Sequence, residues 1–197
     1  MRKLGFLLGG ALALAACSSN PRPVAPADLN NPLFAPGFLA QAASGDQFEI
    51  QSSQLALQAS QNAAVRNFAN MMIADHTRLS QAMGAAAASA RLQPPAPTLL
   101  PAQQAMLDQL RSSGTGPSFD MAYQQAQIQA HQNALTLFQN YAASGDVPAI
   151  RTAAGQAIPT IQSHLSMAQT LQVAPPPPPP PPPAPPPPPV RRSGERG

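Results

Sequence analysis

Apolar residues recur at helical spacing along most of the chain, from about residue 36 to residue 172. This pattern predicts five helices, at 36–60, 63–91, 101–112, 117–143 and 148–172. Clusters of proline, serine and glycine separate the second, third and fourth of them. Because each of the four long helices has one apolar face, the simplest arrangement is an all-α, antiparallel four-helix bundle.

The apolar faces of the expected helices differ in how continuous their apolar stripes are. The helix at 63–91 has a continuous inner stripe, made of Val65, Phe68, Ala69, Met72, His76, Leu79 and Met83. In the helix at 117–143 the expected stripe is Ile128, His131, Leu135 and Phe138. The helix at 36–60 has the weakest face, since small and polar residues share it with Phe38.

Each inner face contains one ionisable residue. His76, His131 and His164 are all the histidines of the chain, and Glu49 holds the corresponding place in the first helix. In an up-down-up-down bundle the two short turns share one end, which puts these four residues at depths of about 17 to 26 Å at about 1.5 Å per residue. We therefore expect the four side chains to meet one another, water or an ion, since an unpartnered buried polar group costs about 1–3 kcal/mol.

Two interpretations of this polar layer remain open. The first is a structural network with buried water, formed by Glu49, Asp75, His76, His131 and His164. The alternative is a site for a divalent transition metal, namely zinc, copper or iron, held by Glu49, His76, His131 and His164. A di-iron centre would need a Glu-x-x-His pair on each of two helices, and Ile73 and Ile161 occupy the glutamate positions here. The sequence therefore favours the network, in which no cofactor is required.

The charge of the chain and the motifs that it lacks exclude two classes of function. Between residues 33 and 174 there are five arginines against six carboxylates, so the body is nearly neutral although the whole chain has a formal charge of +3. A nucleic-acid-binding protein would show a basic patch with aromatic residues among it, and the sequence has none. It also lacks a glycine-rich phosphate loop after a strand, and its serines form no recognisable triad, so we expect no catalytic residues and a role that is not enzymatic.

The first residues form an export signal. Arg2 and Lys3 precede an apolar run that is too short to span a bilayer of roughly 30 Å. Leu14-Ala15-Ala16-Cys17 resembles the bacterial lipobox, which implies lipidation of Cys17, the single cysteine, and anchoring to a membrane through it. Because Ser18 stands where an inner-membrane protein usually has aspartate, the resemblance implies the periplasmic face of the outer membrane.

Four segments follow from these patterns. They are a signal peptide and lipobox at 1–17, a disordered flexible tether at 18–34, the bundle at 35–173, and a proline-rich tail with a basic tip at 174–197. Polyproline II geometry would make the tail a stiff rod of roughly 45 Å. Its arginines could contact a cell-wall polymer or another anionic surface.

Short motifs of the bundle resemble a family of bacterial envelope proteins known as a domain of unknown function, with a predicted ferritin-like four-helix fold. These motifs are Phe38-Leu39 to Glu49, Phe68 to Asp75-His76, Phe119-Asp120-x-x-Tyr123, His131-Gln132 to Leu137-Phe138, and Ile158-Pro159 to His164-Leu165. The resemblance covers about residues 35–172 and implies an exported, helical and often lipid-anchored protein without an established activity. We therefore expect a lipid-anchored periplasmic bundle with a binding or structural role, and metal binding is the alternative function.

Overall fold

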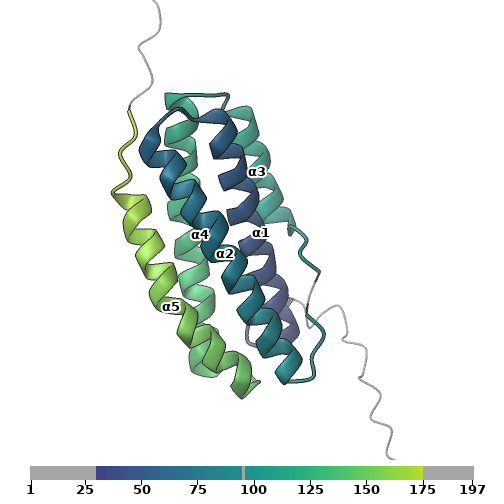
Figure 1. Ribbon diagram of the computed structural model, residues 1–197. Helices are drawn as coiled ribbons and strands as arrows, with labels where there is room; N and C mark the ends of the chain where they lie inside the picture. Colours follow the sequence, from purple (N-terminus) through teal and green to yellow (C-terminus); the bar gives the residue numbers. More distant parts are fainter. Residues whose placement is uncertain (1–29, 95, 175–197) are drawn as a thin grey trace, which may run out of the picture.

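The computed structural model describes residues 30–94 and 96–174, and all regular structure in these ranges is helical. The helices are α1 (Ala35–Ala59), α2 (Ala63–Ser89), α3 (Pro101–Ser112), α4 (Pro117–Ser144) and α5 (Pro148–Gln169) (Figure 1). The predicted all-α class is confirmed, although α5 ends three residues earlier than expected. None of the described helices is both long and apolar enough to cross a membrane. The signal peptide, Cys17, most of the tether and the proline-rich tail lie outside the described residues.

Proline and asparagine mark where the helices begin. Four of the five helices have a proline in the first two positions, where its missing N–H costs no helical hydrogen bond. In α2 the side chain of Asn62 accepts a hydrogen bond from Ala64 N at 2.9 Å. These signals explain why the sequence pattern located the helix starts within one residue.

The four long helices form a bundle in which α1 packs on α2 and α4, and α5 packs on the same two helices from the other side. Figure 1 shows that α1 and α5 run in one direction and that α2 and α4 run in the other. The connection over residues 90–116 therefore crosses the length of the bundle. The turn between α1 and α2 lies beside the start of α4, where Gly116 N donates a hydrogen bond to Ala59 O at 2.9 Å.

This connectivity corrects the up-down-up-down topology assumed from the sequence. The turn between α4 and α5 lies at the opposite end of the bundle from the turn between α1 and α2, and there Asp146 N donates to Leu33 O at 3.2 Å. The two turns therefore give no common origin for measuring depth. His76 and His131 nevertheless lie at the same depth, because they are at the middle of α2 and α4. Reversing the direction of a helix does not change the depth of its middle residue.

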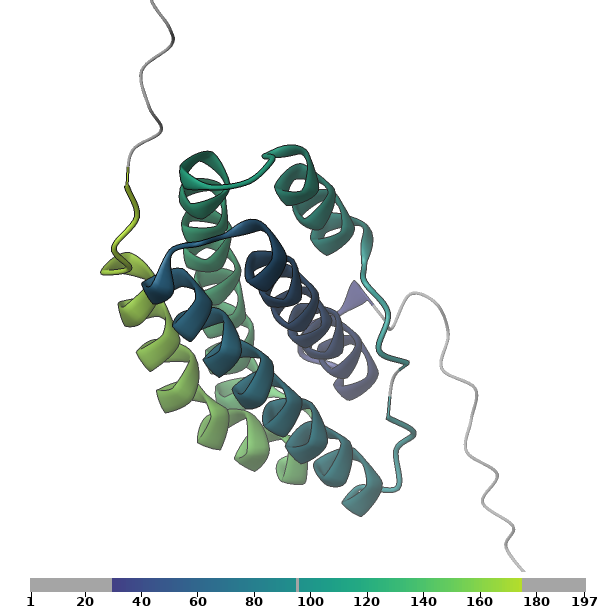
Figure 2. The same ribbon diagram turned by 45° about the horizontal axis from the view of Figure 1, so that its top comes forward.

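Helix α3 stands outside the ring of four and packs against α1 and α4 (Figure 2). Its buried residues are Leu107 and Leu110. Since α3 and the loop before it cover the outer side of α1, that helix buries residues on more than its inner face, including Ser44, which accepts a hydrogen bond from Leu100 N at 2.7 Å. This cover explains why α1 has the weakest apolar pattern and yet many buried positions.

The apolar core has two separate clusters. One is centred on Phe38, Phe138, Tyr141, Ile150 and Ile161, and the other on Phe48, Phe68, Met72, Phe119 and Tyr123. Each long helix contributes to both, and in α2, α4 and α5 the histidine lies between the two sets in the sequence. In α4 the face is rotated from the expected stripe, since Ile128 and Leu135 are only half-buried while Gln127 is fully buried.

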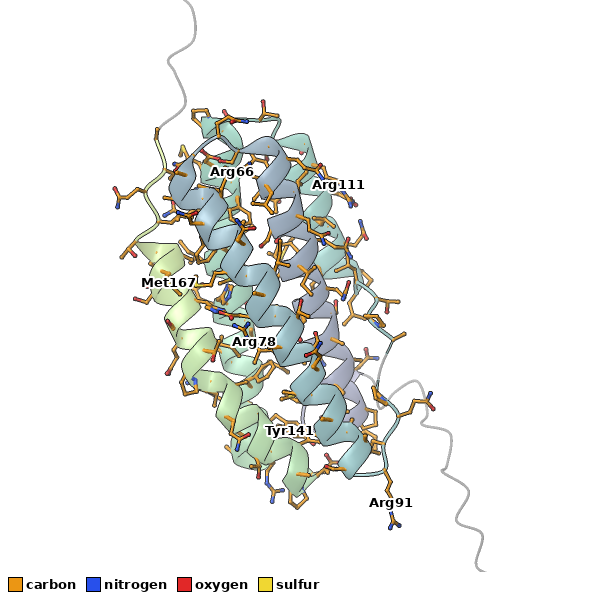
Figure 3. The ribbon with its side chains drawn as sticks, in the orientation of Figure 1. Arg66, Arg78, Arg91, Arg111, Tyr141 and Met167 are labelled. Atoms are coloured by element: carbon orange, nitrogen blue, oxygen red, sulfur yellow. The ribbon has the colours of Figure 1, made fainter. Side chains whose placement is uncertain are left out.

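The sequence Ala-Ala-Ser-Gly-Asp occurs twice and adopts two conformations. Residues 42–46 are a continuous part of α1, whereas 142–146 end α4 and form the turn before α5. In that turn Asp146 Oδ1 accepts hydrogen bonds from Ala35 N at 2.8 Å and from the Tyr141 hydroxyl at 2.9 Å. Tyr141, at the lower end of the bundle in Figure 3, also stacks on Phe38 with ring centroids 4.1 Å apart.

The two glycines of this repeat should respond oppositely to alanine. A Cβ on Gly45 would meet no heavy atom within 4 Å, so Gly45→Ala should stabilise the helix by about 0.5–1 kcal/mol. A Cβ on Gly145 would approach the Tyr141 ring to 2.5 Å, and this buried ring cannot yield easily. Gly145→Ala should therefore lower the free energy of unfolding by about 1–3 kcal/mol. Urea unfolding followed by circular dichroism measures both changes, and equal effects would contradict the assigned conformations.

Candidate functional site

Three histidines from three helices meet in the layer between the two apolar clusters. The rings of His76 on α2, His131 on α4 and His164 on α5 have centroid separations of 5.3 to 5.5 Å. Each ring offers one nitrogen to a group whose ligand atoms lie within 4.8 Å of one another. All three side chains are buried, with exposures of 3%, 0% and 1%. The structure thus brings together the three histidines that the sequence placed on apolar faces.

Each ring is oriented by a hydrogen bond at one of its two nitrogens. His76 Nδ1 donates to Asp46 Oδ1 at 2.8 Å, and Asp46 Oδ2 also accepts from the Ser80 hydroxyl at 2.7 Å. His164 Nε2 donates to Asp75 Oδ2 at 2.9 Å. His131 Nδ1 donates to the backbone carbonyl of Gln127 at 2.8 Å. Partners of this kind, a carboxylate or a carbonyl, commonly orient histidines that bind metals.

These bonds determine the chemistry of the remaining ring nitrogens. A carbonyl or an ionised carboxylate only accepts, so in the neutral ring the nitrogen facing it carries the proton and the other presents a lone pair. The nitrogens left over are His76 Nε2, His131 Nε2 and His164 Nδ1, and none has a hydrogen-bond partner among the described residues. The site can therefore present three imidazole lone pairs in one buried layer.

Glu49 borders this group without belonging to it. Its Oε1 lies 3.6 Å from His131 Nδ1, on the side of the ring that faces Gln127, and its Oε2 has no hydrogen-bond partner among the described residues. Asp75, also expected in the polar layer, orients His164 and forms an ion pair with Arg78 on the surface, labelled in Figure 3. The three histidines thus form the group of possible ligands, while Glu49 stands beside them.

Burial and neighbouring charges move the pKa values in different directions. Burial lowers the pKa of His131 and of His164 to about 4, and the nearby His76 adds to both shifts. Burial also opposes a charge on His76, but the hydrogen bond to Asp46 and the charge of Glu49 outweigh it and raise the pKa of this ring. Burial raises the pKa of Glu49 to about 7. Without a metal, His76 is therefore the ring of the cluster that binds a proton most readily, while the other two rings stay neutral down to about pH 4.

These shifts make stability depend on pH with a definite sign. His131 and His164 bind protons more weakly when folded, so the stability they contribute is present above about pH 6.5 and is lost as the pH falls through about 4. Glu49 binds its proton more tightly when folded, so its contribution is present below about pH 4.5 and is lost as the pH rises through about 7.

The cluster fits a metal ion by donor type and by spacing. Metal–nitrogen bonds of about 2.0–2.1 Å in a tetrahedral site place the donor atoms roughly 3.4 Å apart. The ligand atoms here lie within 4.8 Å of one another, so side-chain rotations that move them by about an ångström would bring them to the spacing of a metal site. Imidazole suits zinc, copper and iron, and the hydrogen bonds at the outer nitrogens leave the required lone pairs free.

Two functional partners escaped the sequence analysis. Asp46 was not among the expected residues, and its position three residues before Glu49 on the same helix is the signal that could have placed it near the inner face. The Gln127 carbonyl, one turn before His131, is a backbone group, and no side-chain pattern points to it.

Comparison with known proteins gives a family and a fold. Residues 19–171 match the model of the family described as "Domain of unknown function (DUF4142)". No curated protein matches the chain. The chain is similar to a solved structure described as "CopM in the Cu(II)-bound form", with a TM-score of 0.58 and 18% identity over 70% of this chain and 94% of that chain. That similarity shows a shared fold, and the family match over most of the length shows that the chain belongs to the DUF4142 family.

Proposed function

We propose that this protein binds one divalent transition-metal ion through His76, His131 and His164. Two observations support the proposal most: one nitrogen of each of the three buried rings lies within 4.8 Å of the others, and each ring has one nitrogen without a hydrogen-bond partner among the described residues. A bound ion would accept all three lone pairs at once. The sequence alone favoured a structural network, and the positions of these nitrogens shift our preference to metal binding.

A purely structural network explains the cluster less well. In such a network every donor should face an acceptor, because a buried polar group without a partner costs about 1–3 kcal/mol. Here the three inner nitrogens have no hydrogen-bond partner among the described residues, and a proton on His76 could satisfy at most one of the other two. The two carboxylates Asp46 and Asp75 already accept from the outer N–H groups. A cation is the simplest partner for such an arrangement. In the metal-free protein the proton on His76 would serve as that cation, and a metal would displace it.

Copper(II) is the ion that we expect to bind most tightly. Affinity for nitrogen ligands rises along the series from Mn²⁺ to Cu²⁺ and falls again at Zn²⁺. The solved structure with a similar fold is described as copper-bound, but at 18% identity it supports only the fold. Our choice of copper therefore depends on the donor set of this chain.

The wider setting is part of the same proposal. The crossover connection between α2 and α4 and the polar layer at mid-height are features of ferritin-like bundles, and we assign the chain to that architecture. We place it on the periplasmic face of the outer membrane, anchored through Cys17, because of the lipobox at the end of an export signal. The arginines of the tail would contact an anionic surface such as cell-wall polymer. In this setting the protein would bind or store metal in the envelope, and no catalytic step is assigned to it.

Metal binding should appear as stabilisation that depends on the histidines. At a free copper(II) or zinc concentration of about 100 times Kd, the free energy of unfolding should rise by about 2.7 kcal/mol. His76→Gln should lose most of this gain, because it removes one of three ligands. Thermal melts with and without a chelator, together with the metal content of the purified protein, measure both effects.

Ser53→Ala provides a matched control for this experiment. Ser53 is buried on α1, four residues after Glu49, and hydrogen-bonds to the Tyr123 hydroxyl at 2.8 Å, but it belongs to no group of possible metal ligands. This variant should lose stability equally with and without metal. If copper and zinc leave the wild-type melt unchanged and no metal is retained, the cluster is a structural network and the proposal is wrong.

The number of protons released on metal binding should be low. At pH 5.5 three ordinary imidazoles would release nearly three protons, since an unperturbed histidine has a pKa of about 6.5. Here His131 and His164 are already neutral at that pH, so only His76 should release a proton. The measurement uses the Glu49→Gln variant, because the Glu49 carboxyl has a pKa of about 7 and could release a proton of its own. This variant should release about one proton. Calorimetry in buffers of different ionisation enthalpy measures this number. A value near three would contradict the assigned protonation states.

Anchoring is tested at the lipobox. Cys17→Ser removes the thiol that would be lipidated, so the protein should leave the membrane fraction or remain unprocessed. Ser18→Asp keeps the thiol and should move the protein from the outer to the inner membrane. Fractionation of cells expressing each variant provides the measurement, and a Cys17→Ser protein that still fractionates with the outer membrane would rule out the lipid anchor.

A further inference from the structure

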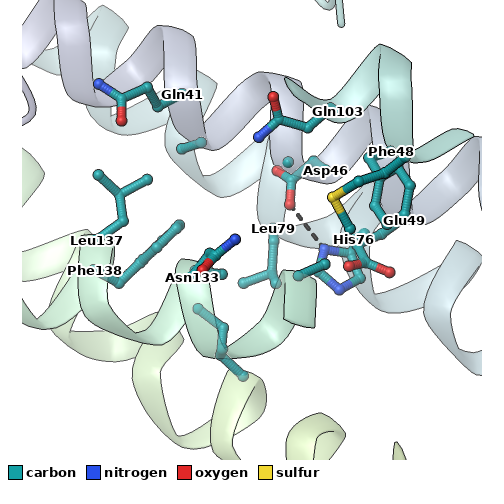
Figure 4. Close-up of a pocket in the computed structure, with 16 residues that line it drawn as sticks. Gln41, Asp46, Phe48, Glu49, His76, Leu79, Gln103, Asn133, Leu137 and Phe138 are labelled. Carbon is teal, nitrogen blue, oxygen red and sulfur yellow. Dashed lines mark hydrogen bonds and ion pairs between the residues drawn. The ribbon is translucent and has the colours of Figure 1, made fainter. Parts of the chain in front are cut away.

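A cavity of about 120 Å³ lies next to the histidine cluster, between α1, α3 and α4 (Figure 4). Gln41, Gln103 and Asn133 supply amide groups to its lining, and Asn133 is exposed, so the cavity reaches the surface there. Apolar side chains, among them Phe48 and Leu137, form much of the remaining wall.

The inner end of the cavity is formed by residues of the polar layer. His76, Asp46 and Glu49 all line it, and Figure 4 shows the bond between His76 and Asp46 at this end. Glu49 is 3% exposed, and its Oε2 has no hydrogen-bond partner among the described residues. Glu49 thus brings a buried carboxyl group to the wall of a space large enough to hold a small molecule.

The cluster itself supplies fewer ligands than a metal accepts. Zinc is almost always four-coordinate, and sites with three protein ligands keep the fourth position for water or substrate. Among the described residues only the three histidines form the ligand group. Of the three histidines, His76 lines the cavity, so an additional ligand would approach the metal past the His76 ring.

We propose that the cavity binds a small neutral molecule with a nitrogen or oxygen donor, which completes the coordination of the metal and hydrogen-bonds to Glu49. This inference rests on the proposed metal site. It assigns to the protein a ternary complex of chain, metal and small molecule, in which α1, α3 and α4 select the molecule.

Charge and size define the ligand class. The lining contains the carboxylates Asp46 and Glu49, and once a metal has displaced the proton of His76 it contains no cationic side chain, so these walls favour a neutral ligand over an anion. The mixture of apolar side chains and amides suits a compact molecule with one polar end. An engineered cavity of about 150 Å³ in another protein holds benzene, so a five-membered ring such as imidazole is close to the largest ligand that would fit.

Gly45 provides a way to fill the cavity without touching a proposed ligand. It lines the cavity from α1, and a Cβ built on it meets no heavy atom within 4 Å. Gly45→Leu would therefore place a side chain in the space, and Gly45→Ala would add a single methyl group. Gly84 is a matched control, because it is also a helical glycine with no heavy atom within 4 Å of an added Cβ, and it does not line the cavity.

The test uses the copper(II)-loaded protein and imidazole as the probe, at concentrations that leave the copper content unchanged. Electron paramagnetic resonance with ¹⁴N- and ¹⁵N-imidazole should show one additional nitrogen on the copper. Gly45→Leu should weaken imidazole binding by about tenfold or more, Gly45→Ala should weaken it less, and Gly84→Leu should leave it unchanged. All three variants should bind copper as the wild type does.

The outcomes separate this inference from the proposed function. If the protein binds no copper, the metal site is wrong. If it binds copper and imidazole adds no nitrogen signal, or if Gly45→Leu binds imidazole as tightly as Gly84→Leu does, the metal site stands and the cavity inference is overturned. If azide or acetate binds more tightly than imidazole, the neutral ligand class is wrong.

Discussion

The structure depends on a buried layer of imidazole rings held between two apolar clusters. Burying three rings with 0–3% exposure is tolerable only if their polar atoms are satisfied, and Asp46, Asp75 and the Gln127 carbonyl satisfy one nitrogen of each ring. The other three nitrogens are left to one another. Because these unpartnered nitrogens lie at the centre of the fold, the packing of the helices and the chemistry of the site depend on each other.

The same layer specifies how the long helices are rotated. His76 can reach Asp46 only if α1 turns that carboxylate toward α2, and His164 can reach Asp75 only if α2 presents it to α5. Alanine-rich faces alone would permit several rotations, since small side chains fit many neighbours. The directional hydrogen bonds remove that freedom, and α3 then covers the side of α1 that would otherwise expose Phe48 and the cavity.

The sequence contained enough information for the helices and for the identity of the site, but not for the topology. Helix starts were predictable because prolines and Asn62 stand at them. The histidines were predictable because an imidazole in an apolar stripe is unusual. Chain direction was not, because hydrophobic periodicity is the same for a helix and for its reverse. Asp46 was missed because α1 is buried on two sides, so that its helical pattern no longer separates an inner from an outer face.

The crossover over residues 90–116 divides the bundle into two helical hairpins, α1–α2 and α4–α5. His76 belongs to the first hairpin, and His131 and His164 belong to the second. Each hairpin closes over a turn of a few residues and can form early, but the three ring nitrogens meet only after the hairpins have docked. A bound ion would then join segments that the chain itself connects only through the crossover, much as a cross-link does. Metal occupancy would therefore report the docking of the two halves, and separating them would release the ion.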